Sequence, residues 1–140
     1  MPEILVIVSR KLHWNLSSTY LFEVDGEQSV IESRFDRYSF AFEGSQYSLD
    51  CSYNDATIRN SADEVGAISR SEWGSSFEVR FDGNLLSCNL KDHPLVLRRG
   101  SQTVATLTRD RSLTWSARIE GESALVPAVV AFLLVLMQPS

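Results

Sequence analysis

The sequence predicts a mainly β protein, a closed antiparallel barrel of about 12 strands wrapped around a buried hydrophobic C-terminal α-helix. Three observations lead to this prediction. Apolar and polar residues alternate with a period of two along most of the chain before residue 124, turn signals separate these runs, and a long apolar segment lies near the C-terminus. The 140 residues, 44% hydrophobic and 22% charged, are typical of one domain. We therefore expect a single domain, 1–140, with strands from about 3 to 120 and the helix at about 124–137.

The alternating runs are the predicted strands, because in each of them one face is apolar and the other polar, as a sheet with one dry side requires. The clearest candidates are 38–42, 47–53, 77–81 and 113–119. Weaker candidates are 4–8, 12–16, 20–24, 28–33, 57–60, 65–69, 85–90, 95–98 and 103–109.

Four X-Gly pairs fall between these runs, where a tight hairpin needs a residue with positive φ. They are Asp25-Gly26, Glu43-Gly44, Asp82-Gly83 and Arg99-Gly100. Successive strands are therefore expected to be antiparallel neighbours.

The segment 124–137 contains no polar side chain. It is longer than an ordinary strand, Pro127 would lie in the first turn of a helix, and Ser123 is the expected N-cap. A helix that is apolar on every side must be buried on every side, in lipid or in a protein core. At roughly 21 Å it is short of the roughly 30 Å of a bilayer core, so no transmembrane span is expected. A short C-terminal membrane anchor remains the alternative.

The width of such a helix sets the size of the barrel around it. An eight-stranded barrel is filled by its own side chains, so a helix roughly 10 to 12 Å across needs a wider one. About 12 strands meet that requirement.

Three segments carry a resemblance to a known family. They are the hairpin strand Val-Gly-Ala-Ile-Ser-Arg at 65–70, the run Trp-Gly-Ser-Ser-Phe-Glu-Val at 73–79, and the apolar segment at 129–137. In this pattern the chain resembles the tubby C-terminal-like superfamily, which includes the LURP-one-related proteins and the phospholipid scramblases. The resemblance implies a twelve-stranded barrel with the C-terminal helix through its centre. It also implies, as for some relatives, binding of phosphoinositide or other membrane lipids.

Residues typical of catalysis or metal binding do not form a recognisable motif. Both histidines, His13 and His93, stand alone, and His93 reads as a turn residue between Asp92 and Pro94. Cys51 and Cys88 fall on apolar strand phases, which favours buried, reduced thiols. We therefore expect no enzyme activity, no cofactor and no metal, in a cytoplasmic protein.

The charge pattern excludes one class of partner and suggests another. A net charge of −5, from 13 basic and 18 acidic residues, argues against a nucleic-acid binder held by phosphate contacts. Four arginines, Arg98, Arg99, Arg109 and Arg111, face only one nearby acid, Asp110. Arginine forks bind phosphate well, so these four are the candidate ligand-binding residues, provided that the hairpin register brings them together. Pairing with acids from neighbouring strands, or plain solvation, explains these arginines more simply than a bound anion does.

These observations predict a non-enzymatic domain that binds membrane phospholipid or another anionic ligand, at the periphery of a membrane. Two alternatives stay open: a structural or protein-interaction scaffold, and a tail-anchored membrane protein.

Overall fold

The computed structural model describes residues 3–15, 17–53, 55–71, 74–111 and 113–138, with the side chain of Arg111 outside the described part. Within these ranges the chain forms twelve strands, a short 3-10 helix and one α-helix. In chain order they are β1 (Glu3–Leu12), β2 (Ser18–Val24), β3 (Glu27–Arg34), β4 (Arg37–Phe42), β5 (Ser45–Cys51), β6 (Asp55–Asn60), β7 (Asp63–Arg70), β8 (Ser76–Phe81), β9 (Asn84–Asn89), β10 (Leu95–Arg99), β11 (Gln102–Arg111), β12 (Thr114–Glu120), η1 (Ser123–Leu125) and α1 (Val126–Met137).

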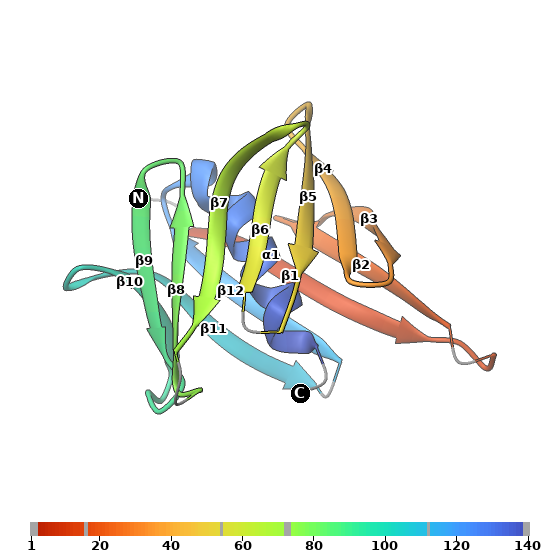
Figure 1. The fold of residues 1–140 in the computed structure, drawn as a ribbon. Helices are drawn as coiled ribbons and strands as arrows, with labels where there is room; N and C mark the ends of the chain where they lie inside the picture. Colours follow the sequence, from red (N-terminus) through yellow and green to blue (C-terminus); the bar gives the residue numbers. More distant parts are fainter. Residues whose placement is uncertain (1–2, 16, 54, 72–73, 112, 139–140) are drawn as a thin grey trace.

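The strands form one closed barrel in which each strand pairs with the next along the chain and β12 returns to pair with β1 (Figure 1). All pairs are antiparallel, and the closing ladder runs from Glu3 opposite Glu120 to Ser9 opposite Thr114. Short turns favour this order, because a strand reversed by a few residues lies beside the strand it has just left. The predicted closed barrel of about twelve strands is confirmed.

The first hairpin differs from the expectation. Instead of separate strands at 4–8 and 12–16, one continuous strand β1 pairs with β2 as far as Leu12 opposite Ser18, and residues 13–15 lie in the turn. Leu16 lies outside the described residues. Tyr53, expected at the end of a strand, lies in the turn after β5. In both places the ladder with the neighbouring strand, and not the local alternation, sets where the strand ends.

The helix α1 lies inside the barrel. Residues 126–134 are buried on every side, and α1 packs against β1 and β12 and also against β5, β6 and β8, which stand elsewhere around the barrel wall. Pro127 lies in its first turn, as predicted. Ser123 does not cap it: the N-cap is Leu125, without a side-chain hydrogen bond, because η1 leads into the helix.

The barrel has two distinct ends, because odd-numbered strands run towards one of them and even-numbered strands return (Figure 1). The acidic end comprises the turns β2–β3, β4–β5, β6–β7, β8–β9 and β10–β11 and the segment between β12 and η1. The aromatic end comprises the turns β1–β2, β3–β4, β5–β6, β7–β8, β9–β10 and β11–β12 and the end of α1.

Candidate functional site: an aromatic rim at one end of the barrel

The four arginines singled out from the sequence do not come together. Arg98 and Arg99 lie at the acidic end, opposite Thr103 and Gln102 of β11. Arg109 lies near the other end of β11, seven residues from Gln102, and is thus roughly 23 Å away along the strand. The backbone of Arg111 continues towards the aromatic end, and its side chain is outside the described part.

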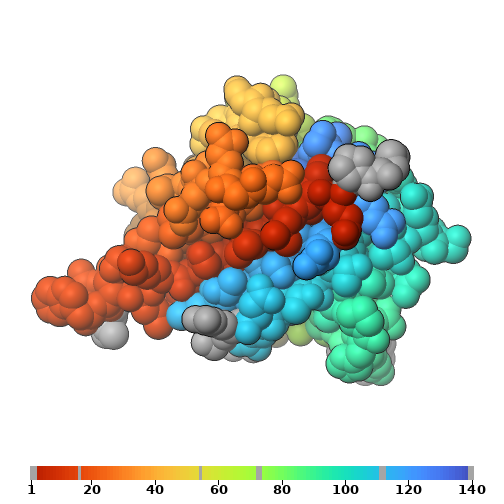
Figure 2. All heavy atoms as spheres, turned by 180° about the vertical axis from the view of Figure 1, so that it is seen from behind, coloured from red at the N-terminus to blue at the C-terminus, as the bar shows by residue number. Residues whose placement is uncertain are grey.

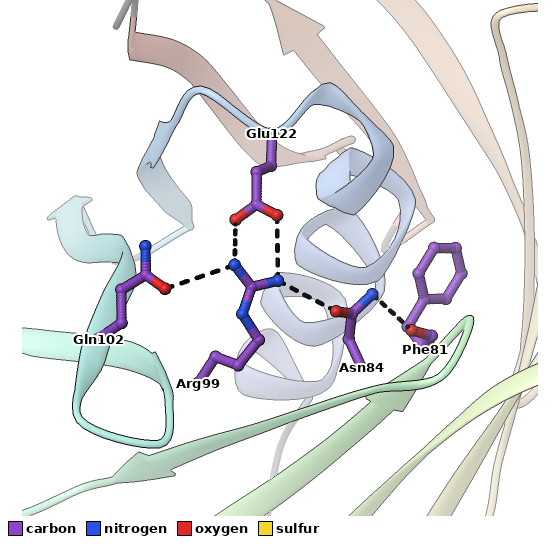
Figure 3. A network of polar contacts seen from close by, with 5 residues as sticks. All are labelled: Phe81, Asn84, Arg99, Gln102 and Glu122. Atoms are coloured by element: carbon purple, nitrogen blue, oxygen red, sulfur yellow. Dashed lines mark hydrogen bonds and ion pairs between the residues drawn. The ribbon is translucent and has the colours of Figure 1, made fainter.

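Arg99 is engaged in a polar network that joins the barrel wall to the segment before the helix (Figure 3). Its Nη2 and Nη1 donate to the two carboxylate oxygens of Glu122 at 2.9 and 3.0 Å. Nη1 also donates to Asn84 Oδ1 at 3.0 Å, and Nη2 to Gln102 Oε1 at 3.5 Å. A bidentate guanidinium–carboxylate pair is strong and directional. Arg99 therefore anchors the entry to the helix, while Arg98 lies 3.9 Å from Asp92 Oδ2.

The aromatic end carries three fully exposed aromatic side chains on successive turns. Trp14 in the β1–β2 turn is 97% exposed, Phe35 in the β3–β4 turn 90%, and Tyr53 in the β5–β6 turn 96%. Turns that are two strands apart around a barrel are separated by roughly 10 Å at the wall. We call Trp14, Phe35 and Tyr53 the aromatic rim. In Figure 2 the β1–β2 turn projects well beyond the body of the barrel.

Phe35 holds its position in a strained backbone conformation. Its φ is +57°, in the left-handed region that glycine and asparagine adopt easily and a bulky side chain seldom does. Other non-glycine residues with positive φ, Asp25, Glu43, Ser61 and Asp82, are polar. Because the Phe35 ring is 90% exposed, it contributes nothing to the core, and the fold does not require an aromatic residue at this turn position.

Basic residues flank the aromatic rim. Arg34 and Arg37 stand on either side of the β3–β4 turn, and Lys11 precedes the β1–β2 turn. Arg37 Nε donates to Asp50 Oδ1 at 2.6 Å, and this hydrogen bond lowers the pKa of the Asp50 carboxyl below its usual value. Among the described residues Arg34 and Lys11 form no ion pair, so their charges are available to an anion.

The two ends differ sharply in charge. In the turns of the acidic end, each with its adjoining strand residues, seven carboxylates face only Arg99. They are Asp25, Glu27, Glu43, Asp63, Asp82, Glu120 and Glu122. In the turns of the aromatic end, counting described side chains alone, four basic residues face three acids. The bases are Arg34, Arg37, Arg70 and Lys91, and the acids Asp36, Asp55 and Asp92. The barrel is therefore electrically polar along its axis.

A small cavity lies beside Tyr53, between the wall and the end of α1. It has a volume of about 100 Å³, and its lining includes Cys51, Arg70, Phe77 and Val135. The guanidinium of Arg70 stands over the Phe77 ring, 5.5 Å from its centroid, and Arg70 Nη2 donates to the Gly74 carbonyl at 3.1 Å. The cavity lies next to Tyr53 of the rim, and its lining mixes apolar and polar side chains.

The thiols and imidazoles show no arrangement for catalysis. Burial raises the pKa of Cys51 and raises that of Cys88 to about 11, so both thiols stay protonated and poorly nucleophilic at neutral pH. His93 is exposed in the β9–β10 turn, as predicted, and His13 Nε2 shares a 2.7 Å hydrogen bond with Thr19 Oγ1. No cluster of three or more His, Cys, Asp or Glu suited to a metal occurs within the described ranges.

Comparison with known proteins adds no family to this picture. No protein-family model matches the chain, and no curated protein and no solved structure matches it. Within the part of the chain that the structure describes, no helix has both the length and the apolar character needed to cross a bilayer.

Sequence reasoning missed the aromatic rim. Trp14 and Tyr53 were assigned to strands, and Phe35 to no element. One signal was present: Phe35 stands between Arg34 and Asp36, and Trp14 between His13 and Asn15, with no apolar neighbour on either side. A large aromatic residue between polar neighbours at a chain reversal indicates an exposed ring.

Proposed function

We propose that this protein is a non-enzymatic domain that docks through its aromatic end on a membrane surface bearing anionic phospholipids. The observation that carries the proposal is the aromatic rim: three exposed rings on successive turns at one end, one of them in a strained backbone.

The chemistry of these side chains suits the interface of a bilayer. Tryptophan and tyrosine prefer the headgroup level, where one side of the ring is apolar and the polar atom stays wet. Moving one such ring out of water is worth about 1.5 to 3 kcal/mol. The free guanidinium of Arg34 and the ammonium of Lys11 would add about 1 kcal/mol each near an anionic surface.

The charge difference between the ends orients the barrel. A negative surface repels the carboxylates of the acidic end and attracts Arg34 and Lys11, so the aromatic end approaches first. Anionic lipids are characteristic of the cytoplasmic leaflet, which is the surface we propose. The resemblance to the tubby C-terminal-like superfamily supports the same class of ligand, although Arg98 and Arg99 lie at the opposite end and take no part in this docking.

The test is co-sedimentation of the full-length chain with phosphatidylcholine vesicles, alone or containing phosphatidylserine or phosphoinositide, at low and physiological salt. We expect the protein to pellet with anionic vesicles and to be released by salt. The triple substitution Trp14→Ser, Phe35→Asn and Tyr53→Ser should weaken binding about tenfold or more per ring. Leu85→Ser is the matched control, because Leu85 is an exposed apolar residue at the acidic end.

Charge reversal separates this proposal from the arginine hypothesis of the sequence. Arg34→Glu should weaken binding to anionic vesicles, whereas Arg99→Gln, which removes a positive charge at the acidic end, should leave it unchanged. If no vesicle binds the protein, or the triple variant binds as well as the parent chain, membrane docking is wrong. The aromatic rim would then be the contact surface of an interaction scaffold.

A further inference from the structure

The barrel wall has a gap at its acidic end. The ladder between β3 and β4 covers only the stretch from Arg34 opposite Arg37 to Glu32 opposite Ser39, so residues 27–31 and 40–42 are not paired with each other. The ladders on both sides of this gap are complete: β2 pairs with β3 as far as Val24 opposite Glu27, and β4 with β5 as far as Phe42 opposite Ser45. The wall therefore opens locally between two intact hairpins.

A cavity of about 510 Å³ lies at this gap and reaches the first residue of the central helix. This volume falls in the range of small-molecule sites. Its apolar lining is formed by Ile4, Phe22, Val24, Ala41, Phe42 and Val126. The apolar surface can hold the hydrocarbon part of a ligand.

The polar lining of the same cavity is acidic. Asp25, Glu27 and Glu43 contribute carboxylates, Ser29 and Ser123 contribute hydroxyls, and no basic residue lines it within the described ranges. Asp25 Oδ1 accepts a hydrogen bond from the Leu5 amide at 2.9 Å. Glu27 and Glu43, both exposed, form no ion pair or hydrogen bond among the described residues.

From this combination we infer that the cavity binds a small organic cation, a primary ammonium group on an apolar body. The ammonium would sit between Glu27 and Glu43, and the body would lie against Phe22, Phe42 and Val126. Charge complementarity excludes anions. A bare metal ion would find hydrocarbon over much of its surroundings, where it needs several oxygen ligands.

This inference is independent of membrane docking, because the cavity and the aromatic rim lie at opposite ends of the barrel. A barrel docked through its aromatic end would leave the cavity facing water. Binding is therefore measured without lipid, and its failure would say nothing about docking.

The experiment is a titration of the full-length chain with butylammonium, hexylammonium and octylammonium, followed by calorimetry or NMR chemical shifts. We expect saturable binding of one ligand per chain, which weakens as salt is added. Affinity should rise about fourfold per added methylene until the cavity is filled. Hexanol, which lacks the charge, should bind more weakly than hexylammonium.

Substitutions locate the site. Glu27→Gln and Glu43→Gln should each weaken binding by up to about fivefold, since these are exposed charge pairs. Asp63→Asn is the matched control, because Asp63 lies at the same end but does not line the cavity. Ala41→Phe places a ring at the opening from an exposed position and should abolish binding without unfolding the chain.

Four results would overturn the inference. Equal affinity for hexanol and hexylammonium would mean that charge is not recognised. Affinity independent of chain length would mean surface ion pairing only. Loss of binding in Asp63→Asn equal to that in Glu27→Gln would place the ligand elsewhere, and displacement by millimolar Ca²⁺ would identify a metal site instead.

Discussion

The two ends of the barrel are built differently around the same helix. At the acidic end the polypeptide entering the helix is tied to the wall by the Arg99–Glu122 pair, and several turns are two-residue reversals with glycine at positive φ. At the aromatic end the last helical residues, 135–137, are only half-buried, and Gln138 Nε2 donates to the Tyr38 hydroxyl at the long distance of 3.4 Å. The acidic end therefore ties the start of the helix to the wall by a bidentate ion pair. At the aromatic end the ion pair of Arg37 with Asp50 lies on the wall itself, and three exposed rings face the surroundings.

The difference between the two ends separates the part of the molecule that stabilises the fold from the part that is free to contact other molecules. The interior is uniformly apolar, with no buried polar or charged side chain among the described residues, so packing against α1 holds the barrel together. The turns are then free to vary in chemistry, because they add little to that core. Four tests of this contrast follow, in order of the expected effect on the free energy of unfolding.

The largest effect is expected inside the helix. Phe132→Asp would place a charge where nothing compensates it, and should cost more than about 4 kcal/mol, enough to prevent folding. The same change at the half-buried Met137, at the aromatic end, should be tolerated. Circular dichroism and thermal unfolding of both variants check this. A fragment of residues 1–123 that unfolds cooperatively would contradict the central role of the helix.

The second largest effect on the free energy of unfolding is expected from alkaline pH, through Tyr38 near the aromatic end. Burial raises the pKa of Tyr38 to about 12, above the usual value of a tyrosine, because the folded state favours the neutral phenol. This stabilisation is complete below about pH 10 and is lost as the pH rises towards 12, by about 2 kcal/mol. Urea unfolding between pH 8 and 12 measures it. Tyr38→Phe should show a smaller alkaline loss, and an equal loss would assign it to other groups.

Weakening the Arg99–Glu122 ion pair at the acidic end should lower the free energy of unfolding moderately. Glu122→Gln keeps the shape but weakens the bidentate pair with Arg99, and should lower stability by about 1 kcal/mol because both groups are partly exposed. Gln138→Ala, which removes the 3.4 Å hydrogen bond to Tyr38 at the aromatic end, should cost less than about 0.5 kcal/mol. Chemical denaturation compares the two. If Gln138→Ala lowered the free energy of unfolding more than Glu122→Gln, the helix would be held more firmly at the aromatic end than at the acidic end.

The smallest effect on stability is expected at the tip of the aromatic rim. Phe35→Asn relieves a positive φ that asparagine accepts, so stability should be unchanged or rise by up to about 1 kcal/mol. Vesicle binding should fall in the same variant, because a ring is lost. Thermal unfolding and co-sedimentation on one preparation check both parts. A substantial loss of stability would show that Phe35 serves the fold and not a contact.

The architecture was largely predictable, and particular residues show why. Alternation at Phe77, Val79 and Phe81 marks an inward face, and these residues are buried as expected. The apolar run 124–137 had to be buried on every side, in lipid or in a protein core, and a wide barrel provides such a core. In contrast, whether Arg98 and Arg109 meet depended on register. The ladder places Arg98 of β10 opposite Thr103, at the end of β11 away from Arg109.

The sequence by itself determined a twelve-stranded barrel around a hydrophobic helix, because period-two alternation and an apolar segment each have few ways to be buried. Tertiary structure alone decided which turns share an end, and therefore that Trp14, Phe35 and Tyr53 form one rim while the carboxylates gather opposite. It also decided where the wall opens between β3 and β4. The physical reason is that burial is a property of each residue and its near neighbours, whereas a site is a relation between turns that only strand pairing and closure bring together.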